Sequence, residues 1–191
     1  MTYCRILLHG GYAGRWDNAG CDLPLFQKLI DAAQSADRRL MISFLAQEKA
    51  SDFIRLDELI ETFGKLAPSI ELVIADRTNF HALLPHHKVV FLQGGSSQAQ
   101  QKFLSGTSKE ELLYNKVMLA GSSSGASMLC DHGFSGSSQP VKGVNIVNLC
   151  VMPHANSWPI EEYLPSLRAA SDAPILFLKE YEIVEMDIKV G

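Results

Sequence analysis

The sequence lacks the features that mark membrane, secreted and nucleic-acid-binding proteins. No segment approaches the roughly 18 consecutive apolar residues that cross a bilayer. The N-terminus has no basic leader followed by a long apolar stretch, so we expect no signal peptide. Lysine and arginine number 17 against 21 aspartates and glutamates, which gives a formal net charge of −4. With no basic excess to neutralise phosphates, we expect neither nucleic acid nor an anionic membrane as a partner.

Motifs for metals and organic cofactors are also missing. The four cysteines are Cys4, Cys21, Cys130 and Cys150, and none forms a Cys-x-x-Cys pair or has metal-ligand spacing. Three of them lie in apolar runs, so we expect free thiols in a reducing cytoplasm. The sequence contains no His-x-x-x-His, no phosphate loop with lysine and no complete Gly-x-Gly-x-x-Gly. We therefore expect no metal and no organic cofactor.

What the sequence does contain is a regular alternation of short apolar runs with longer amphipathic stretches. The apolar runs are Cys4–His9, Leu40–Leu45, Ile70–Ala75, Lys88–Leu92 and Val117–Ala120. Strands of this length separated by helices indicate βαβ units. We predict one α/β domain over residues 1–191, with a mainly parallel central sheet covered on both faces. The loops after its strands are then the place for a ligand site.

The pattern changes in the last third of the chain. Gly133–Gly143 is rich in glycine and serine and is typical of an exposed loop or hairpin. Val144–Met152 is strand-like and Ile160–Ala170 is helical in pattern. Ile175–Lys179 and Ile183–Val190 are predicted to form a terminal strand pair. There is no internal repeat and no low-complexity linker, so no domain boundary is drawn.

The strongest local signal is the Gly-x-Ser-x-Gly motif of residues 121–125. It follows an apolar strand and precedes small and apolar residues suited to a helix, the layout of a nucleophile elbow. Ser123 is centred between the two glycines, whereas its competitors Ser122 and Ser124 are not. The hydroxyl of such a serine points into a cleft, where backbone N–H groups can stabilise an oxyanion. The alternative is a phosphate-binding or merely tight βα turn.

A serine nucleophile needs a base, and the sequence offers six histidines. They are His9, His81, His86, His87, His132 and His154. His81, His86 and His87 are predicted to face solvent, His132 to lie near the end of the helix after Ser123, and His9 to be structural. His154 follows a strand-like run, and a loop at a strand end can bring imidazole to the elbow. His154 is therefore the predicted base.

At this point the sequence resembles a known family. Gly121–Ala126 followed by Pro153-His154 is similar to the Gly-x-Ser-Ala-Gly-Ala and Pro-His elements of the aspartyl dipeptidase (dipeptidase E) and cyanophycinase family of serine peptidases. Phe91–Gln98 resembles its Gly-Gly-Asn-Thr segment. The resemblance covers nearly the whole chain and implies a fold like class I glutamine amidotransferase domains. It implies Ser123 as nucleophile, His154 as base, and the amides of Ser124 and of Gly94 or Gly95, beside Ser123, as oxyanion donors.

The sequence departs from this family in three respects. The stretch from Ser123 to His154 is shorter than in the family's peptidases. Ser96-Ser97 stands where the family has Asn-Thr. The family also places an acid between serine and histidine to orient the imidazole, and the only carboxylate between Ser124 and Pro153 is Asp131. Two other candidates for the third group, Glu161 and Glu162, closely follow His154. A polar side chain could also replace the acid, and the candidates for this are Ser137, Ser138 and Gln139.

The substrate and two rival functions remain open at this stage. A short peptide is the expected substrate, and a preference for N-terminal aspartate would require a cation such as Arg168, or Arg15 with Trp16. An α/β-hydrolase esterase is disfavoured because His154 lies only 31 residues after Ser123, although His9-Gly10-Gly11 imitates its oxyanion loop. A weak or inactive small-molecule-binding homologue is the second rival. A homodimer is left open.

Overall fold

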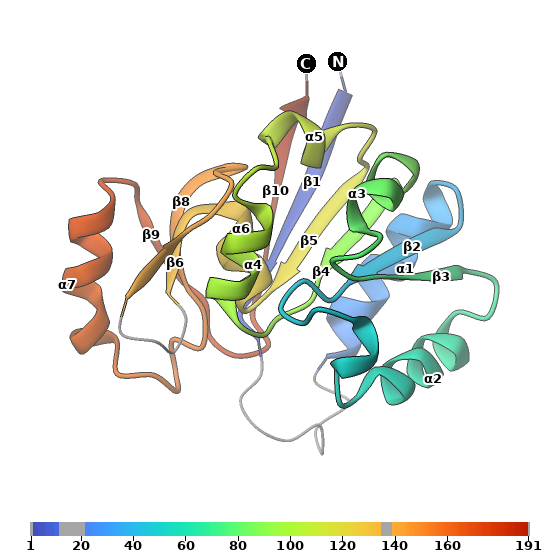
Figure 1. Ribbon diagram of the computed structural model, residues 1–191, viewed down its shortest axis with the longest axis horizontal. Coiled ribbons are helices and arrows are strands. Elements are labelled where there is room, and N and C mark those ends of the chain that lie inside the picture. Colours follow the sequence, from blue (N-terminus) through green and yellow to red (C-terminus); the bar gives the residue numbers. More distant parts are fainter. Residues whose placement is uncertain (1, 12–21, 135–138, 191) are drawn as a thin grey trace.

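The central sheet has six strands in the order β10-β1-β5-β4-β2-β3. The computed structural model describes residues 2–11, 22–134 and 139–190. The strands are β1 (Thr2–His9), β2 (Arg39–Ser43), β3 (Glu71–Ala75), β4 (Val89–Leu92), β5 (Met118–Ser122) and β10 (Ile183–Val190). All neighbours pair in parallel except β10, which runs antiparallel along β1 at one edge (Figure 1). The predicted α/β class with a mainly parallel sheet is confirmed.

Helices cover both faces of this sheet because its strands alternate their side chains between two apolar cores. In β1, Ile6 and Leu8 enter one core and Leu7 the other. On the Leu7 side lie α1 (Leu23–Ser35), η2 (Ala50–Asp52) and α2 (Leu56–Leu66). On the opposite side lie α3 (Phe80–Leu83), η3 (Leu84–His86), α4 (Ser97–Leu104), α5 (Lys109–Leu113) and α6 (Ser124–Leu129). The strands are buried on both faces, as their continuous apolar runs predict.

A second, smaller sheet packs beyond α6, on the side away from α1 and α2 (Figure 1). Its order is β7-β6-β8-β9, formed by β6 (Cys130–Phe134), β7 (Pro140–Lys142), β8 (Val147–Met152) and β9 (Ile175–Phe177). Strands β6, β8 and β9 are parallel, and β7 is antiparallel to β6. Helix α7 (Ile160–Ala170) packs on this sheet through a third apolar cluster around Leu167.

The predicted pairing of the last two strands is wrong. β9 joins the second sheet beside β8, and β10 joins the central sheet beside β1. Both segments are strands, as expected, but each finds its partner far away in the sequence. The segment between them, residues 178–182, therefore crosses from one sheet to the other and is not a hairpin turn. Within the described residues, no helix is long and apolar enough to cross a membrane.

Candidate active site

Ser123 occupies a sharp turn between β5 and α6. Its backbone has φ 52° and ψ −114°, a region that a residue with a side chain adopts only when its surroundings enforce it. The flanking glycines make the turn possible. A Cβ on Gly121 would lie 2.4 Å from the carbonyl of Gly125, and one on Gly125 would lie 2.1 Å from the Leu92 oxygen. The spacing of the motif thus lets α6 start directly against the ends of β4 and β5.

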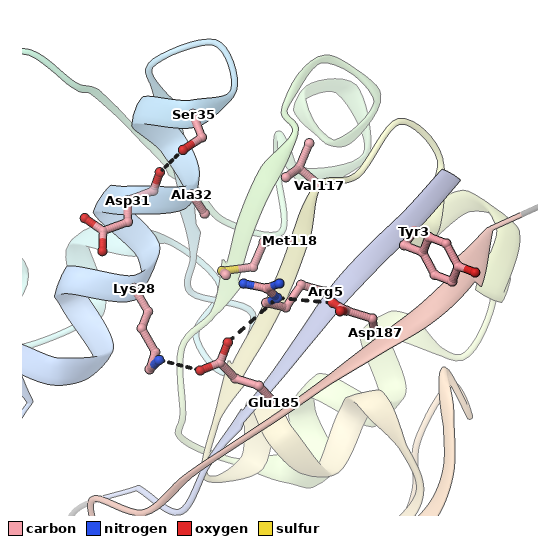
Figure 2. A pocket seen from close by; sticks show the side chains of 10 residues that line it. All are labelled: Tyr3, Arg5, Lys28, Asp31, Ala32, Ser35, Val117, Met118, Glu185 and Asp187. Carbon is pink, nitrogen blue, oxygen red and sulfur yellow. Dashed lines mark hydrogen bonds and ion pairs between the residues drawn. The ribbon is translucent and has the colours of Figure 1, made fainter. Parts of the chain in front are cut away.

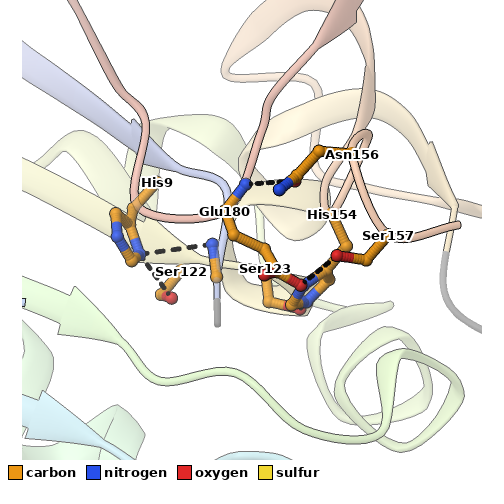
Figure 3. Close-up of polar contacts among 8 residues, drawn as sticks. His9, Ser122, Ser123, His154, Asn156, Ser157 and Glu180 are labelled. Carbon is orange, nitrogen blue, oxygen red and sulfur yellow. Dashed lines mark hydrogen bonds and ion pairs between the residues drawn. The ribbon is translucent and has the colours of Figure 1, made fainter. Parts of the chain in front are cut away.

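His154 comes to Ser123 from the second sheet. It lies in the turn just after β8, also with a positive φ of 55°. Its Nε2 is 2.9 Å from Ser123 Oγ, so the hydroxyl can donate to the imidazole (Figure 3). The imidazole stacks at a tilt on Trp158, with ring centroids 4.8 Å apart. The structure thus brings together the predicted nucleophile and base, although they belong to different sheets.

The far nitrogen of His154 faces a carboxylate from the segment between β9 and β10. His154 Nδ1 is 3.3 Å from Oε1 of Glu180, and both side chains are almost fully buried. Ser157 Oγ donates to the same carboxylate oxygen at 2.7 Å, and Asn156 Oδ1 accepts from the backbone N–H of Glu180 at 2.8 Å (Figure 3). These contacts fix the carboxylate at the imidazole.

The protonation state of His154 follows from two opposing effects. Burial lowers its pKa below the usual 6.5, while the hydrogen bond and charge of Glu180 raise it in part. The net pKa is lowered, so the imidazole is neutral at pH 7. With Nε2 accepting from Ser123, the proton of the neutral ring lies on Nδ1 and points at Glu180. A neutral imidazole that accepts from serine is the state a general base requires.

The structure corrects the prediction that Asp131 orients His154. Asp131 lies in β6, where its carboxylate binds His132 at 3.0 Å and Ser171 at 2.5 Å. The pairing of β6 with β8 shifts its register between Cys130 and His132. His132 is therefore on a strand and not at a helix end, because α6 has only six residues. The carboxylate at the imidazole is Glu180, which was not among the predicted residues.

The other candidates for the third group lie elsewhere. Glu161 and Glu162 are exposed in the first turn of α7, and Gln139 is exposed beside β7. Ser137 and Ser138 fall outside the described residues, as do Arg15 and Trp16. One signal for Glu180 is present in the sequence: it closely follows the apolar run Ile175–Leu178, and loops after strands carry sites in α/β folds.

The Gly94-Gly95 loop lies beside the elbow, as predicted. A Cβ on Gly94 would be 3.2 Å from Ser123 Cβ, whereas Gly95 faces Ala46. The loop borders a pocket of about 210 Å³ in front of Ser123. Its lining consists of Gly11, Gln47, Phe53, Gln93, Gly94, Gly95, Ser122 and Ser123. None of these described residues is charged. Ser124 is buried and begins α6, so its backbone N–H lies in the first turn of that helix.

Arg168 is not part of this pocket. It is exposed near the end of α7 and lines a separate depression with Ser171 and Phe177. One other histidine prediction needs correction: His87 is fully buried, with Nδ1 2.7 Å from the Leu83 carbonyl. His81 is exposed, as predicted, and stacks on Phe103 at 5.1 Å between ring centroids.

A larger depression, of about 450 Å³, lies at the opposite end of the strands. Arg5 and Met118 contribute to it from β1 and β5, and α1 forms its other wall (Figure 2). Its two cations are paired: Arg5 lies 3.1 Å from Asp187 and 3.8 Å from Glu185, which also pairs with Lys28. Neither Ser123 nor His154 lines this depression, so it is separate from the pocket at the elbow.

One group of side chains in the described residues has the composition of a metal site. Ligand atoms of Asp131, His132 and Cys150 lie within 4.8 Å of one another in the second sheet. The carboxylate and imidazole are hydrogen-bonded to each other, and the carboxylate also binds Ser171. The group lies apart from Ser123 and His154 and contributes nothing to their contacts.

Comparisons with known proteins support the architecture. No family model matches the sequence, and no curated protein matches it. The structure is similar to a peptidase from an acI-B1 Actinobacterium, with a TM-score of 0.65 at 17% identity over 95% of this chain and 82% of that one. It is also similar to a protein from Listeria monocytogenes EGD-e proposed to be a Peptidase E, with a TM-score of 0.63 at 13% identity over the whole of both chains. The chain therefore has the mixed α/β fold of these two structures.

Proposed function

We propose that this protein is a serine-type peptidase that hydrolyses short peptides through an acyl-enzyme on Ser123. The observation that carries the proposal is the unbroken line of contacts from Ser123 Oγ to His154, at 2.9 Å, and on to Glu180, at 3.3 Å. Nucleophile, base and orienting carboxylate in this order are recognised by their geometry and not by their spacing in the sequence. The positive φ of Ser123 and the resemblance to the dipeptidase E and cyanophycinase family support the same assignment.

The geometry supports a two-step reaction. Ser123 Oγ attacks the peptide carbonyl carbon while its proton passes to Nε2 of His154. The tetrahedral intermediate collapses when Nε2 gives this proton to the leaving amine and the C–N bond breaks. A water molecule, deprotonated by the same nitrogen, then attacks the ester carbonyl. The bond from carbon to Ser123 Oγ breaks as Nε2 returns the proton to that oxygen, and the acid is released. Throughout, Glu180 stabilises the imidazolium that forms and does not itself take up the proton.

The backbone around Ser123 supplies the groups for the oxyanion. Gly94 is next to the serine, and the Ser124 N–H lies in the first turn of α6, where no helical acceptor exists for it. Preorganised donors of this kind are worth about 2.7–4 kcal/mol each in transition-state stabilisation. We propose the amide of Ser124 and that of Gly94 or Gly95 for this role.

The pocket supports a small substrate. Its volume of about 210 Å³ suits one side chain of modest size, in keeping with a dipeptide or tripeptide. Its described lining offers the amides of Gln47 and Gln93 and the ring of Phe53. An aspartate preference has no cation to support it among these residues, since Arg168 lies elsewhere. We therefore propose a substrate residue with an uncharged side chain.

The rival interpretation, an inactive binding homologue, rested on a missing acid. Glu180 occupies that position, and Ser157 and Asn156 hold its side chain and its backbone. This carboxylate supports an active peptidase over an inactive homologue. A cytoplasmic location and the question of a homodimer stay predictions.

A kinetic comparison tests the proposal. Wild type, Ser123→Ala and His154→Ala are assayed on a panel of X-Gly dipeptides in which X is Ala, Ser, Asn, Gln or Asp. We expect turnover by wild type and a loss of at least about 10³-fold in both variants. Ser105→Ala, a change of an exposed serine at the end of α4, is the matched control and should retain wild-type turnover. Equal turnover by wild type and Ser123→Ala would disprove the proposal.

A further inference from the structure

Residues 9–11, at the end of β1, connect all three parts of the proposed triad. Their three carbonyl groups each accept one backbone hydrogen bond from a different loop. The donors are the N–H of Ser123 to His9 at 2.9 Å, of His154 to Gly10 at 3.0 Å, and of Tyr181 to Gly11 at 2.9 Å. Tyr181 follows Glu180 directly, so the loops of nucleophile, base and carboxylate are all anchored to this one tripeptide.

The tripeptide is also in direct contact with the reacting side chains. A Cβ on Gly11 would lie 2.6 Å from His154 Nε2 and 2.7 Å from Ser123 Cβ. The backbone of Gly11, which has a φ of +84°, therefore fills the space beside the Ser123–His154 contact. Because a Cβ would clash with both reacting side chains, a displacement of Gly11 toward them would change the distance between hydroxyl and imidazole.

The His9 side chain holds Gly11 in this place. Its imidazole is fully buried, and Nδ1 accepts from Ser122 Oγ at 2.9 Å and from the Gly11 N–H at 3.3 Å (Figure 3). One nitrogen thus ties Gly11 to the residue just before the nucleophile.

The bonds define the tautomer of His9. A nitrogen that accepts from a backbone N–H carries no proton, so the proton of the neutral ring lies on Nε2. Nε2 of His9 faces the buried carboxylate of Asp22 at 3.7 Å. The negative charge of this carboxylate favours a proton on Nε2. Burial, with a smaller contribution from His154, lowers the pKa of His9 to about 4, so the ring is neutral at pH 7.

We propose that His9 is a positioning residue for the peptidase reaction: its Nδ1 fixes Ser122 and Gly11, and through them the alignment of Ser123 with His154. The assignment rests on the proposed function, because it concerns the alignment of that nucleophile and base. It predicts a much larger effect on kcat than on substrate binding. His9 itself is buried behind the elbow and does not line the pocket, and only Gly11 and Ser122, which it holds, border it.

Three variants separate the role of Nδ1 from burial in general. His9→Leu removes both ring nitrogens, His9→Asn keeps an acceptor near the position of Nδ1, and His9→Gln places its amide near the position of Nε2. We expect His9→Leu and His9→Gln to lose about 10²-fold in kcat, the cost of misalignment by roughly 1 Å, with KM within threefold of wild type. His9→Asn should recover most of this loss.

His87→Leu is the matched control, because His87 is also fully buried and also bonded through Nδ1, but far from Ser123. It should lose stability and retain kcat. Thermal melts identify any variant that fails to fold, and His9→Asn then carries the test. Wild-type kcat in His9→Leu or His9→Gln would overturn the proposal, and so would a folded His9→Asn as slow as His9→Leu.

A second measurement does not depend on activity and distinguishes failure of this inference from failure of the proposed function. Long-range ¹H–¹⁵N correlation spectra report which imidazole nitrogen carries the proton. At pH 7 we expect the Nε2–H tautomer for His9, and in His9→Leu a changed His154 signal. A proton on Nδ1 of His9 would overturn the inference even if Ser123 is the nucleophile. The proposed function alone fails if Ser123→Ala keeps wild-type turnover while the His9 tautomer is as expected.

Discussion

Replacing Glu180 by glutamine removes the charge beside the proposed base while keeping a side chain of the same shape. The amide oxygen can still accept from Ser157 and from His154, so the imidazole keeps its place. What is lost is the attraction between carboxylate and imidazolium. At 3.3 Å in a nearly buried site, and with an effective dielectric constant of about 20, this attraction is worth roughly 3–5 kcal/mol.

This energy converts into a rate. Each 1.36 kcal/mol corresponds to about tenfold, so we expect kcat of Glu180→Gln to fall by about 10²–10⁴ with little change in KM. The pH profile provides a second, independent test. Burial lowers the pKa of His154 and Glu180 raises it, so without the carboxylate the pKa falls further. Because the base acts in its neutral form, the acid limb of kcat/KM should move to lower pH in the variant.

The assay is steady-state kinetics from pH 4 to 9 on the best dipeptide of the panel. Glu161→Gln, which changes an exposed carboxylate on α7, is the control and should match wild type in both kcat and acid limb. The reasoning is refuted if Glu180→Gln retains kcat within threefold, or if its acid limb stays where it is in wild type or moves to higher pH.

Four further outcomes are expected. Gly125→Ala, whose Cβ would lie 2.1 Å from a backbone oxygen, should lose about 1–3 kcal/mol in urea unfolding and most of its activity; full activity would contradict the elbow packing. Arg168→Ala should leave KM unchanged for all dipeptides, because Arg168 lines another depression. Burial raises the pKa of Asp131, but hydrogen bonds from Ser171 and His132 outweigh burial and hold this pKa below its usual value. Asp131→Asn should therefore retain kcat but be less stable than wild type at pH 7. This stability difference should disappear as acid protonates the wild-type carboxylate. Burial raises the pKa of Asp22 to about 6. The stability of Asp22→Asn relative to wild type should therefore increase as pH rises from 4 to 6 and stay constant at higher pH. The same stability difference between variant and wild type at pH 4 and pH 8 would contradict this.

The central sheet and the elbow could be predicted because their signals are local. Each apolar run is long enough for one strand and is followed by its own helix, so the order of elements determines a parallel sheet. The same holds for residues 121–125, where two glycines and the intervening serine define the turn by themselves. The observed packing of Gly121 and Gly125 gives the physical reason for that spacing.

The third group could not be predicted because its position depends on a distant pairing. Glu180 reaches His154 only because β9 lies beside β8 and β10 lies beside β1. Alternation within residues 175–190 shows that both segments are strands but not which partner each will choose. A hairpin between them, the local solution, would have left Glu180 in an exposed turn. Asp131 was named because it is the only carboxylate between Ser124 and Pro153, and the structure places it in β6, where it binds His132 and Ser171.

The prediction that Arg168 binds the substrate failed for a similar reason. Arg168 is close to His154 in sequence and on a predicted helix, and that helix does form. Its direction, however, is set by the packing of Leu167 against the second sheet, which leaves Arg168 exposed on the far side from the pocket. Proximity along the chain thus predicted the element but not the face that its side chain occupies.

The central claim, that Ser123 is a nucleophile activated by His154, is tested most directly by covalent labelling. Wild type, Ser123→Ala and Ser105→Ala are incubated with a fluorophosphonate probe, and the labelled peptide is identified by mass spectrometry. We expect one adduct, on Ser123, in wild type and in Ser105→Ala, and none in Ser123→Ala. No adduct in wild type, or equal labelling of Ser123→Ala, would contradict the account.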